Sequence, residues 1–167
     1  LTNVDLTRAN MTRADLTNAD LVNVNLTNVN LTEAYLTNSN LTGANLGNAN
    51  LIDATLTGVV SGGITGTPSA LPDDWQLTSG YLVGPGARLN DAILVNANLT
   101  EAYLFSADLT DANLTEADLY RANLTGPNLT NAILIGADLY DADLANARDV
   151  SESIGSPAVP RTTLFRV

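Results

Sequence analysis

The sequence contains no cysteine, no histidine and no lysine among its 167 residues. The absence of cysteine excludes disulfides and thiolate chemistry, and the absence of histidine excludes imidazole-based catalysis and the common zinc sites. With two phenylalanines and one tryptophan, the chain has little material for a bulky globular core. No apolar run approaches the roughly 20 residues of a membrane-spanning helix. We therefore expect a protein that is not an enzyme, has no cofactor and does not span a membrane.

The positive charges are few, and the chain is strongly acidic. Seven arginines stand against 18 acidic residues, which gives a net charge of −11. Most of the negative charge falls in residues 87–149. Because a phosphate backbone attracts positive charge, direct nucleic-acid binding is not expected. A negative surface suits either solubility, which is the simpler interpretation, or a basic partner.

A repeat of five residues dominates the sequence. Leucine, or once Met11, returns at every fifth position through residues 1–56 and again through residues 89–144. The position two residues earlier holds alanine in most repeats and valine in three, and the exceptions are Ser39 and Pro127. A fixed short period is the signature of a repeat architecture.

This period fits neither a helix nor a straight strand. On an α-helix the leucines would drift by about 140° per repeat, and on a strand every second leucine would face water. The pattern is satisfied if the chain turns a corner in every repeat, with the leucine and the small residue inside. Four corners make a square coil of about 20 residues, and stacked coils lie about 4.8 Å apart. Leu26 and Leu119 are then buried in leucine ladders.

Individual repeats carry a recognisable consensus. Residues 14–18, 44–48 and 107–111 read Ala-Asp-Leu-Thr-Asn, Ala-Asn-Leu-Gly-Asn and Ala-Asp-Leu-Thr-Asp. They resemble the A(D/N)LXX units of the pentapeptide-repeat family, and the resemblance covers residues 1–59 and 87–147. It implies an all-β fold, the right-handed quadrilateral β-helix, here with about six regular coils. The hand of the helix comes from this resemblance, since the spacing leaves it open.

The two repeat blocks are out of phase with each other. We expect one solenoid domain, residues 1–149, interrupted by an insertion at residues 60–86 that is rich in glycine and proline. Within the insertion, residues 75–77 and 81–83 are largely apolar and flank a short glycine-containing loop, which predicts a hairpin. Because a lone hairpin is marginal in water, we expect this one to pack on the solenoid and to shield Trp75.

The regular pattern stops after Ala147. Residues 150–167 mix apolar residues with serine, proline and arginine, and we interpret them as a C-terminal cap, with a short helical turn over residues 149–155. At the other end, Leu1 is in phase with the repeat and no methionine precedes it. We therefore expect missing upstream sequence, in which a signal peptide would lie, and assign no compartment. A homodimer through an exposed solenoid end is a further expectation.

Pro127 stands at an inward position where the other repeats have a small residue with a backbone N–H. Because proline lacks this N–H, we expect it to remove a hydrogen bond between coils. The sequence therefore predicts a local bulge or an irregular coil at Pro127, with the register recovering by Leu129.

A period of 20 residues places side chains directly above one another on neighbouring coils. Two outward columns carry alternating charge: Arg13, Glu33 and Asp53, and Glu101, Arg121 and Asp141. Opposite charges in a column should pair, at about 0.2–1 kcal/mol each. Tyr120 should stack on Tyr140. We interpret these contacts as structural.

The densest acidic patch is formed by Asp118, Asp138, Asp141 and Asp143, with Asp118 one coil below Asp138. A calcium site would need converging carboxylates and carbonyls, and no calcium-binding loop pattern is present. A solvated face is the preferred interpretation. These four aspartates, together with Trp75, are retained as a candidate interaction surface. No catalytic, cofactor-binding or metal-binding residue is assigned.

The leading hypothesis is a non-catalytic structural or protein-interaction scaffold that presents Asn, Asp and Thr to a protein partner. The alternative is an acidic DNA mimic, because the quinolone-resistance members of the resembled family are similar to duplex DNA and bind DNA gyrase, a type II topoisomerase. The net charge and a stack about 30 Å long are compatible with mimicry. Those members, however, dimerise through a C-terminal helix, and the segment around Pro157 and Pro160 has no comparable apolar helix.

Overall fold

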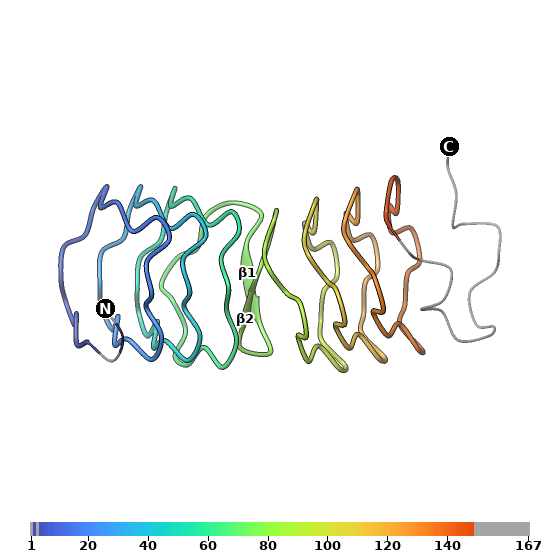
Figure 1. Cartoon of the computed structure of the whole chain (residues 1–167), viewed down its shortest axis with the longest axis horizontal. Helices are drawn as coiled ribbons and strands as arrows, with labels where there is room; N and C mark the ends of the chain where they lie inside the picture. The colour runs from blue at the N-terminus through green and yellow to red at the C-terminus, as the bar shows by residue number, and fades with distance from the viewer. Residues whose placement is uncertain (1, 3, 149–167) are drawn as a thin grey trace. The chain divides into compact units, whose positions relative to one another are not determined.

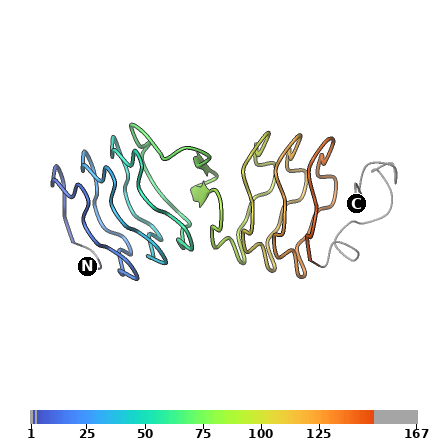
Figure 2. The same cartoon turned by 90° about the horizontal axis from the view of Figure 1, so that it is seen from above.

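A computed structural model describes Thr2 and residues 4–148. The chain divides into two compact units, Leu1–Leu82 and Val83–Val167, called unit 1 and unit 2 below. The strands β1 (Gln76–Thr78) and β2 (Tyr81–Val83) pair in a two-stranded sheet, and the boundary between the units falls within β2. Within each unit, successive coils of the chain lie side by side (Figures 1 and 2).

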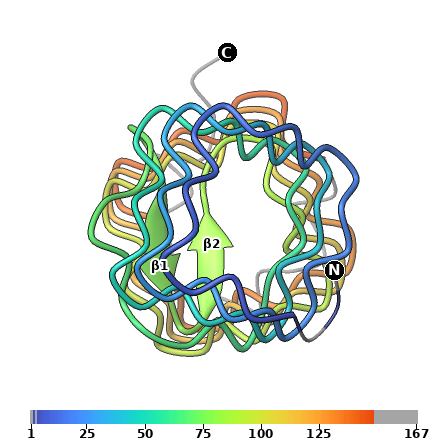
Figure 3. The same ribbon diagram turned by 90° about the vertical axis from the view of Figure 1, so that its left-hand side faces the viewer.

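Parallel β-bridges join residues that are 20 apart in sequence. They run from Asp5↔Asn25 to Asn50↔Ala70 in unit 1, and from Arg88↔Asp108 to Asn128↔Arg148 in unit 2. A bridge recurs at every fifth residue of each block, so a coil has four sides. Viewed from the end, the chain passes once round a ring in each coil (Figure 3). The structure is thus a β-helix of square coils, as the period of five predicts.

One repeat, residues 117–121, shows where the backbone N–H groups go. The N–H of Ala117 donates to the preceding leucine carbonyl at 3.0 Å and closes a corner. The N–H groups of Asp118, Leu119 and Arg121 donate to neighbouring coils at 2.9, 2.8 and 2.9 Å. The remaining N–H, that of Tyr120, donates to the Asp118 side chain at 3.0 Å. Three N–H groups of the five therefore join coils, and the other two are used within the corners.

The last residue of each repeat adopts the left-handed backbone region. Asn18 and Asn28, for example, have φ values of 58° and 57°. A positive φ at this position, together with the corner hydrogen bond, is the pattern of a type II turn. Asparagine, aspartate and glycine tolerate this region because they have a short polar side chain or none. This requirement explains why the fifth position of the repeat is so often one of these three residues.

The interior is lined by the leucine positions and the small positions. Leu26 and Leu119 have no exposed surface, as predicted, and the alanines between the leucines are buried with them. Near the N-terminal end the interior opens, and Leu6 and Met11 are only half-buried. Full burial of a leucine stabilises by about 1.5–3 kcal/mol, so the ladders supply the main driving force for folding.

The bulge predicted at Pro127 is absent, and the prediction was wrong. The carbonyl of Pro127 accepts from the N–H of Arg148 at 3.0 Å, and the next residue, Asn128, donates to the coil below at 3.0 Å. Bridges of Asn128 keep the separation of 20 residues on both sides. The physical reason is that the N–H at this position closes a corner in other repeats and does not join coils. Proline therefore removes a corner bond and leaves the ladder intact.

The ladder of unit 1 extends into the segment that was expected to be inserted. Bridges reach Val60, Thr65 and Ala70, so three more sides follow the last regular leucine. In the same register, Ser61 and Gly66 stand where leucines would point inward. Neither side chain can fill the space of a leucine. The first part of the segment is thus a coil with two vacated inward positions.

The β1–β2 hairpin packs against this coil. Leu82 has no exposed surface and belongs to the core cluster of unit 1, and Trp75 and Leu77 are half-buried against the same cluster. The N–H of Leu82 donates to the Ser61 hydroxyl at 2.9 Å. The turn of the hairpin also contacts this coil, because the N–H of Ile64 donates to the Gly80 carbonyl at 3.0 Å. The hairpin supplies the large apolar side chain that this coil lacks.

Two buried serines allow a matched test of these contacts. The Ser39 hydroxyl is buried without a hydrogen-bond partner, so Ser39→Ala should raise the free energy of unfolding by about 1 kcal/mol. Ser61→Ala would leave the buried N–H of Leu82 without its acceptor and should lower the free energy of unfolding by about 1–3 kcal/mol. Urea unfolding of the two variants measures both changes. Changes of the same sign would contradict the assignment.

The predicted C-terminal cap, residues 150–167, and the helical turn predicted over residues 149–155 lie outside the described residues. Among the residues that the structure does describe, no helix is long and apolar enough to cross a membrane.

Candidate interaction surface

The acidic patch, Asp118, Asp138, Asp141 and Asp143, lies in unit 2. Asp118 and Asp138 are joined by a β-bridge and are therefore direct neighbours on adjacent coils, as the period of 20 predicts. Asp141 follows at the next corner, and Asp143 lies on the next side of the same coil. All four side chains are exposed.

Three of these aspartates have a structural task that the sequence did not reveal. One carboxylate oxygen, Oδ1, of each accepts the N–H two residues on: Asp118 from Tyr120 at 3.0 Å, and Asp138 from Tyr140 at 2.9 Å. Asp143 accepts the N–H of Ala145 in the same way, at 3.0 Å. An asparagine does the same elsewhere, for example at Asn123 with a distance of 3.0 Å. The turn is supported by the oxygen that both residue types share, and the negative charge is additional to it.

A positively charged side chain, that of Arg121, lies beside the patch. The guanidinium of Arg121 is 3.8 Å from a carboxylate oxygen of Glu101 and 3.8 Å from one of Asp141. It also lies over the Tyr120 ring, 4.8 Å from the centroid. The rings of Tyr120 and Tyr140 stack with centroids 5.8 Å apart. The predicted charge pairing and aromatic stacking are confirmed. Because the groups are about half exposed, each ion pair contributes at most about 1 kcal/mol.

The surface contains exposed aromatic residues, of which the sequence reasoning missed Tyr103 and Phe105. Tyr103 and Phe105 are 46% and 50% exposed, and Tyr140 is 61% exposed. A shallow hollow of ≈ 300 Å³ is lined by Glu101, Tyr103, Arg121 and Asn123. The sequence signal for these residues is a local departure from the consensus. Tyr103 stands where most repeats have Asn or Asp, and Phe105 stands where most repeats have Thr. Exposed aromatic side chains are enriched in protein interfaces.

Trp75, the fifth residue of the predicted surface, lies in unit 1. It is half-buried and packs against the core cluster of that unit, as the hairpin argument predicts. The four aspartates form their own group in unit 2. Trp75 is thus first a packing residue of the hairpin.

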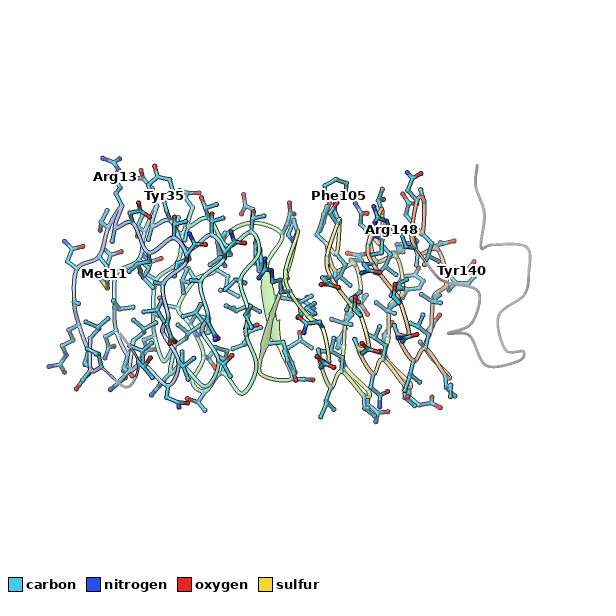
Figure 4. The ribbon with its side chains drawn as sticks, viewed as in Figure 1. Met11, Arg13, Tyr35, Phe105, Tyr140 and Arg148 are labelled. Atoms are coloured by element: carbon cyan, nitrogen blue, oxygen red, sulfur yellow. The ribbon has the colours of Figure 1, made fainter. Side chains whose placement is uncertain are left out.

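Unit 1 carries the second predicted charge column. The Nε of Arg13 donates to Glu33 at 2.7 Å and a terminal nitrogen donates at 3.1 Å, which forms a bidentate pair. The predicted pairing is confirmed for these two residues. Arg13 and Tyr35 both project from the outer surface of neighbouring coils (Figure 4). The hydrogen bond from Arg13 and its positive charge hold the pKa of Glu33 below its usual value.

The corner aspartates of unit 1 also have lowered pKa values. The hydroxyl and the backbone N–H of Thr7 lower the pKa of Asp5, and the backbone N–H of Thr17 lowers that of Asp15. The backbone N–H of Val22 does the same for the pKa of Asp20. In each case the cause is a hydrogen bond that favours the charged carboxylate.

These shifts predict a loss of stability in acid. A carboxylate whose pKa is lower in the folded state stabilises the fold above its ordinary value of 3.8, and this contribution disappears as pH falls through the lowered pKa. We expect the urea midpoint to fall as pH decreases below about 4. The triple variant Asp5→Asn, Asp15→Asn and Asp20→Asn keeps the acceptor oxygens and should show a flatter profile. Parallel profiles for the two proteins would contradict this expectation.

The described residues contain no arrangement suited to metal binding. Within Thr2 and residues 4–148, no group of three or more acidic side chains is placed to hold a metal ion. Asp118, Asp138 and Asp143 each already accept a backbone N–H with one carboxylate oxygen. The arrangement is suited to contacts over a surface.

Comparisons with known proteins give a consistent answer on the family. The model of the pentapeptide repeats matches eight copies, over residues 1–32, 30–59, 86–119 and 117–148. Comparison with curated proteins gives no match.

Several solved structures are similar to this chain. One is HetL, a pentapeptide repeat protein involved in heterocyst differentiation regulation from the cyanobacterium Nostoc sp. strain PCC 7120, at 34% identity over 88% of this chain with a TM-score of 0.41. This chain spans 64% of the length of HetL. Another is QnrB1, a plasmid-mediated fluoroquinolone resistance protein, at 14% identity over 87% of this chain and 74% of QnrB1, with a TM-score of 0.37.

A third is a pentapeptide repeat protein from the Arabidopsis thaliana thylakoid lumen, at 20% identity over 85% of this chain and 63% of that protein, with a TM-score of 0.25. The match to the repeat model covers residues 1–59 and 86–148, which is most of the sequence. The chain belongs to the family of pentapeptide repeat proteins.

Proposed function

We propose that this protein is a non-catalytic interaction module that binds a positively charged protein partner through unit 2. The observation that carries the proposal is the acidic patch with its neighbouring exposed aromatic rings. The negative charge of Asp118, Asp138 and Asp143 is not required by the turns, because asparagine satisfies the same corner. Charge beyond what the fold needs supports a role in recognition.

The scaffold suits this task. In residues 117–121 every backbone N–H is bonded within the protein, so the patch sits on a firmly held backbone and loses little conformational freedom on binding. The exposed rings of Tyr103 and Tyr140 add apolar contact area: Tyr103 lines the hollow together with Glu101 and Arg121, and the backbone N–H of Tyr140 donates to Asp138. The sequence has no histidine, cysteine or lysine to serve as a common base or nucleophile, which supports a non-catalytic role.

Trp75 is not part of the surface proposed on unit 2. Its ring packs against the core of unit 1, where it holds the β1–β2 hairpin in place.

An acidic DNA mimic that binds a type II topoisomerase is the second candidate. The observation that favours it is the spacing of the charges, because Asp118 and Asp138 recur on adjacent coils. In both candidates a basic protein surface would meet the same patch.

The experiment uses two variants with equal changes in charge. The patch variant carries Asp118→Asn, Asp138→Asn, Asp141→Asn and Asp143→Asn. The control variant carries Asp5→Asn, Asp15→Asn, Asp20→Asn and Asp53→Asn. Each set contains three corner acceptors and one residue with positive φ, Asp141 or Asp53. Asparagine suits both situations, so both variants should fold.

Proteins captured from the source cell by the wild type and by each variant are then quantified. We expect a specific partner that is lost with the patch variant and retained with the control. Equal capture by all three proteins, or equal loss with both variants, would refute the proposed surface. A gyrase supercoiling assay separates the candidates. Inhibition by the wild type but not by the patch variant favours the DNA mimic, and no inhibition favours the general interaction module.

A further inference from the structure

One side of the coils of unit 2 carries exposed aliphatic side chains. This side runs over three adjacent coils, because bridges join Ile93 to Asn113 and Asn113 to Ile133. Four of its outward side chains are aliphatic and exposed: Ile93 by 67%, Val95 by 37%, Ile133 by 41% and Ile135 by 54%. These four residues are called the aliphatic strip below. The first two lie on one coil, and the other two lie two coils further on.

The fold does not account for the aliphatic strip. On the coil between the two aliphatic pairs, the Asn113 side chain accepts the N–H of Thr115 at 3.0 Å and its hydroxyl at 2.6 Å. The side chains of Ile93 and Ile133 have no oxygen and cannot support their corners in this way. Because these residues give up a corner hydrogen bond and expose apolar surface to water, contact with a partner is the advantage that they offer.

Negative charge borders the aliphatic strip on both edges. Asp91 and Asp111 stand at the corner before it and Glu116 at the corner after it, and all three are exposed. The Glu116 carboxylate lies against Gly136, the residue that follows Ile135, because a Cβ at this glycine would collide with it. The other residues at these two corners are asparagine and glycine. The surface is therefore apolar along its centre and acidic along its margins.

The spacing within the strip matches an α-helix. The two aliphatic pairs are two coils apart, or about 9.6 Å at 4.8 Å per coil. In an α-helix, residues i and i+7 lie on one face about 10.5 Å apart, at 1.5 Å per residue. A helix that lies along the stack of coils therefore places one apolar residue over each pair. An extended strand fits less well, since the side chains on one of its faces recur about every 6.6 Å.

We propose that the aliphatic strip docks a basic amphipathic helix of a partner protein, with apolar residues at positions i and i+7 and lysine or arginine on both flanks. The apolar residues contact the strip, and the flanking cations meet Asp91, Asp111 and Glu116. The acidic margins disfavour a second copy of this chain and an anionic membrane, because like charges would meet. The strip lies on a different side of unit 2 from the acidic patch, and the inference does not depend on that patch.

A variant that restores the repeat consensus removes the strip and keeps the fold. The strip variant carries Ile93→Asn, Val95→Thr, Ile133→Asn and Ile135→Thr. These changes reproduce the corner of Asn113 and Thr115 on the coils above and below it. The strip variant should therefore be at least as stable in urea as the wild type, so a loss of docking is not a loss of folding.

Disulfide tethering detects docking even where affinity is low, since the chain has no cysteine of its own. The probe is a synthetic peptide with leucine at positions i and i+7, cysteine at i+4, lysine on both flanks and alanine elsewhere. In the control peptide glutamate replaces lysine. Thr115→Cys places a thiol between the two aliphatic pairs, and Thr110→Cys places one on the neighbouring polar side of the same coil. Both threonines are half-buried, so the two positions are matched in exposure.

In a thiol-exchange buffer, we expect Thr115→Cys to capture the lysine peptide about tenfold more than Thr110→Cys, because burial of even one leucine shifts an equilibrium by this factor. The preference should disappear in the strip variant and with the glutamate peptide. Equal capture at the two positions, undiminished capture by the strip variant, or equal capture of the two peptides would overturn the proposal. So would a concentration-dependent dimer in sedimentation that the strip variant abolishes, since the occupant would then be a second copy.

Discussion

Leu26→Asp is expected to abolish folding of unit 1. Leu26 has no exposed surface and lies within a leucine ladder, with leucines above and below it. A carboxylate there would lose its hydration without gaining a partner, which costs several kcal/mol in addition to the lost packing. This is a large part of the total stability of an ordinary domain, about 5–15 kcal/mol. Circular dichroism and thermal unfolding of the purified variant measure the result.

The matched control is Asn25→Asp, one residue away on the outer surface. The Asn25 side chain accepts the backbone N–H of Thr27 at 3.1 Å and its hydroxyl at 2.6 Å. Aspartate offers the same oxygen, so this variant should stay within about 0.5 kcal/mol of the wild type. Leu119→Asp should have the same effect in unit 2, with Asp118→Asn as its control. A folded Leu26→Asp protein with an unchanged melting temperature would refute the inward register.

The features that could be predicted from sequence are those that every repeat enforces. A period of five is compatible with one corner per repeat, and close packing then dictates which positions are large and which are small. The charge columns followed from the period of 20, and the pairs Arg13–Glu33 and Arg121–Asp141 are found as expected. Each of these predictions needed only the distance along the chain between two residues.

The features that were missed depend on the use of individual backbone groups. Spacing alone does not reveal that the N–H of the small position closes a corner and does not join coils. Pro127 was therefore expected to disturb a ladder that it leaves intact. The same limit applied to the corner aspartates, such as Asp118, whose oxygens support the turn. The role of Ser61 needed knowledge that a hairpin distant in sequence supplies Leu82 to the same coil.

This distinction changes which residues are informative about function. Outward asparagines, aspartates and threonines support the corners by hydrogen bonds, so their abundance says little about a partner. Residues that replace them without supporting a corner are more telling, because they give up a local stabilising contact. Tyr103 and Phe105 are examples, and both are about half exposed. The aromatic part of the candidate surface therefore carries information that the consensus residues do not.

Leu82→Ala is expected to detach the β1–β2 hairpin from unit 1. Leu82 is fully buried in the core cluster, next to a coil whose inward positions hold Ser61 and Gly66 in place of leucines. Truncation to alanine should lower the free energy of unfolding by about 2–5 kcal/mol, because it removes buried apolar contacts and leaves a cavity. Leu77→Ala, at a half-buried position of the same hairpin, should have a clearly smaller effect.

Trp75, the only tryptophan, packs on the same cluster and reports the change. Its emission should shift to the red and become more accessible to quenchers in Leu82→Ala. A red-shifted, readily quenched Trp75 in the wild type, or equal effects of the two variants, would show that the hairpin is not packed as described.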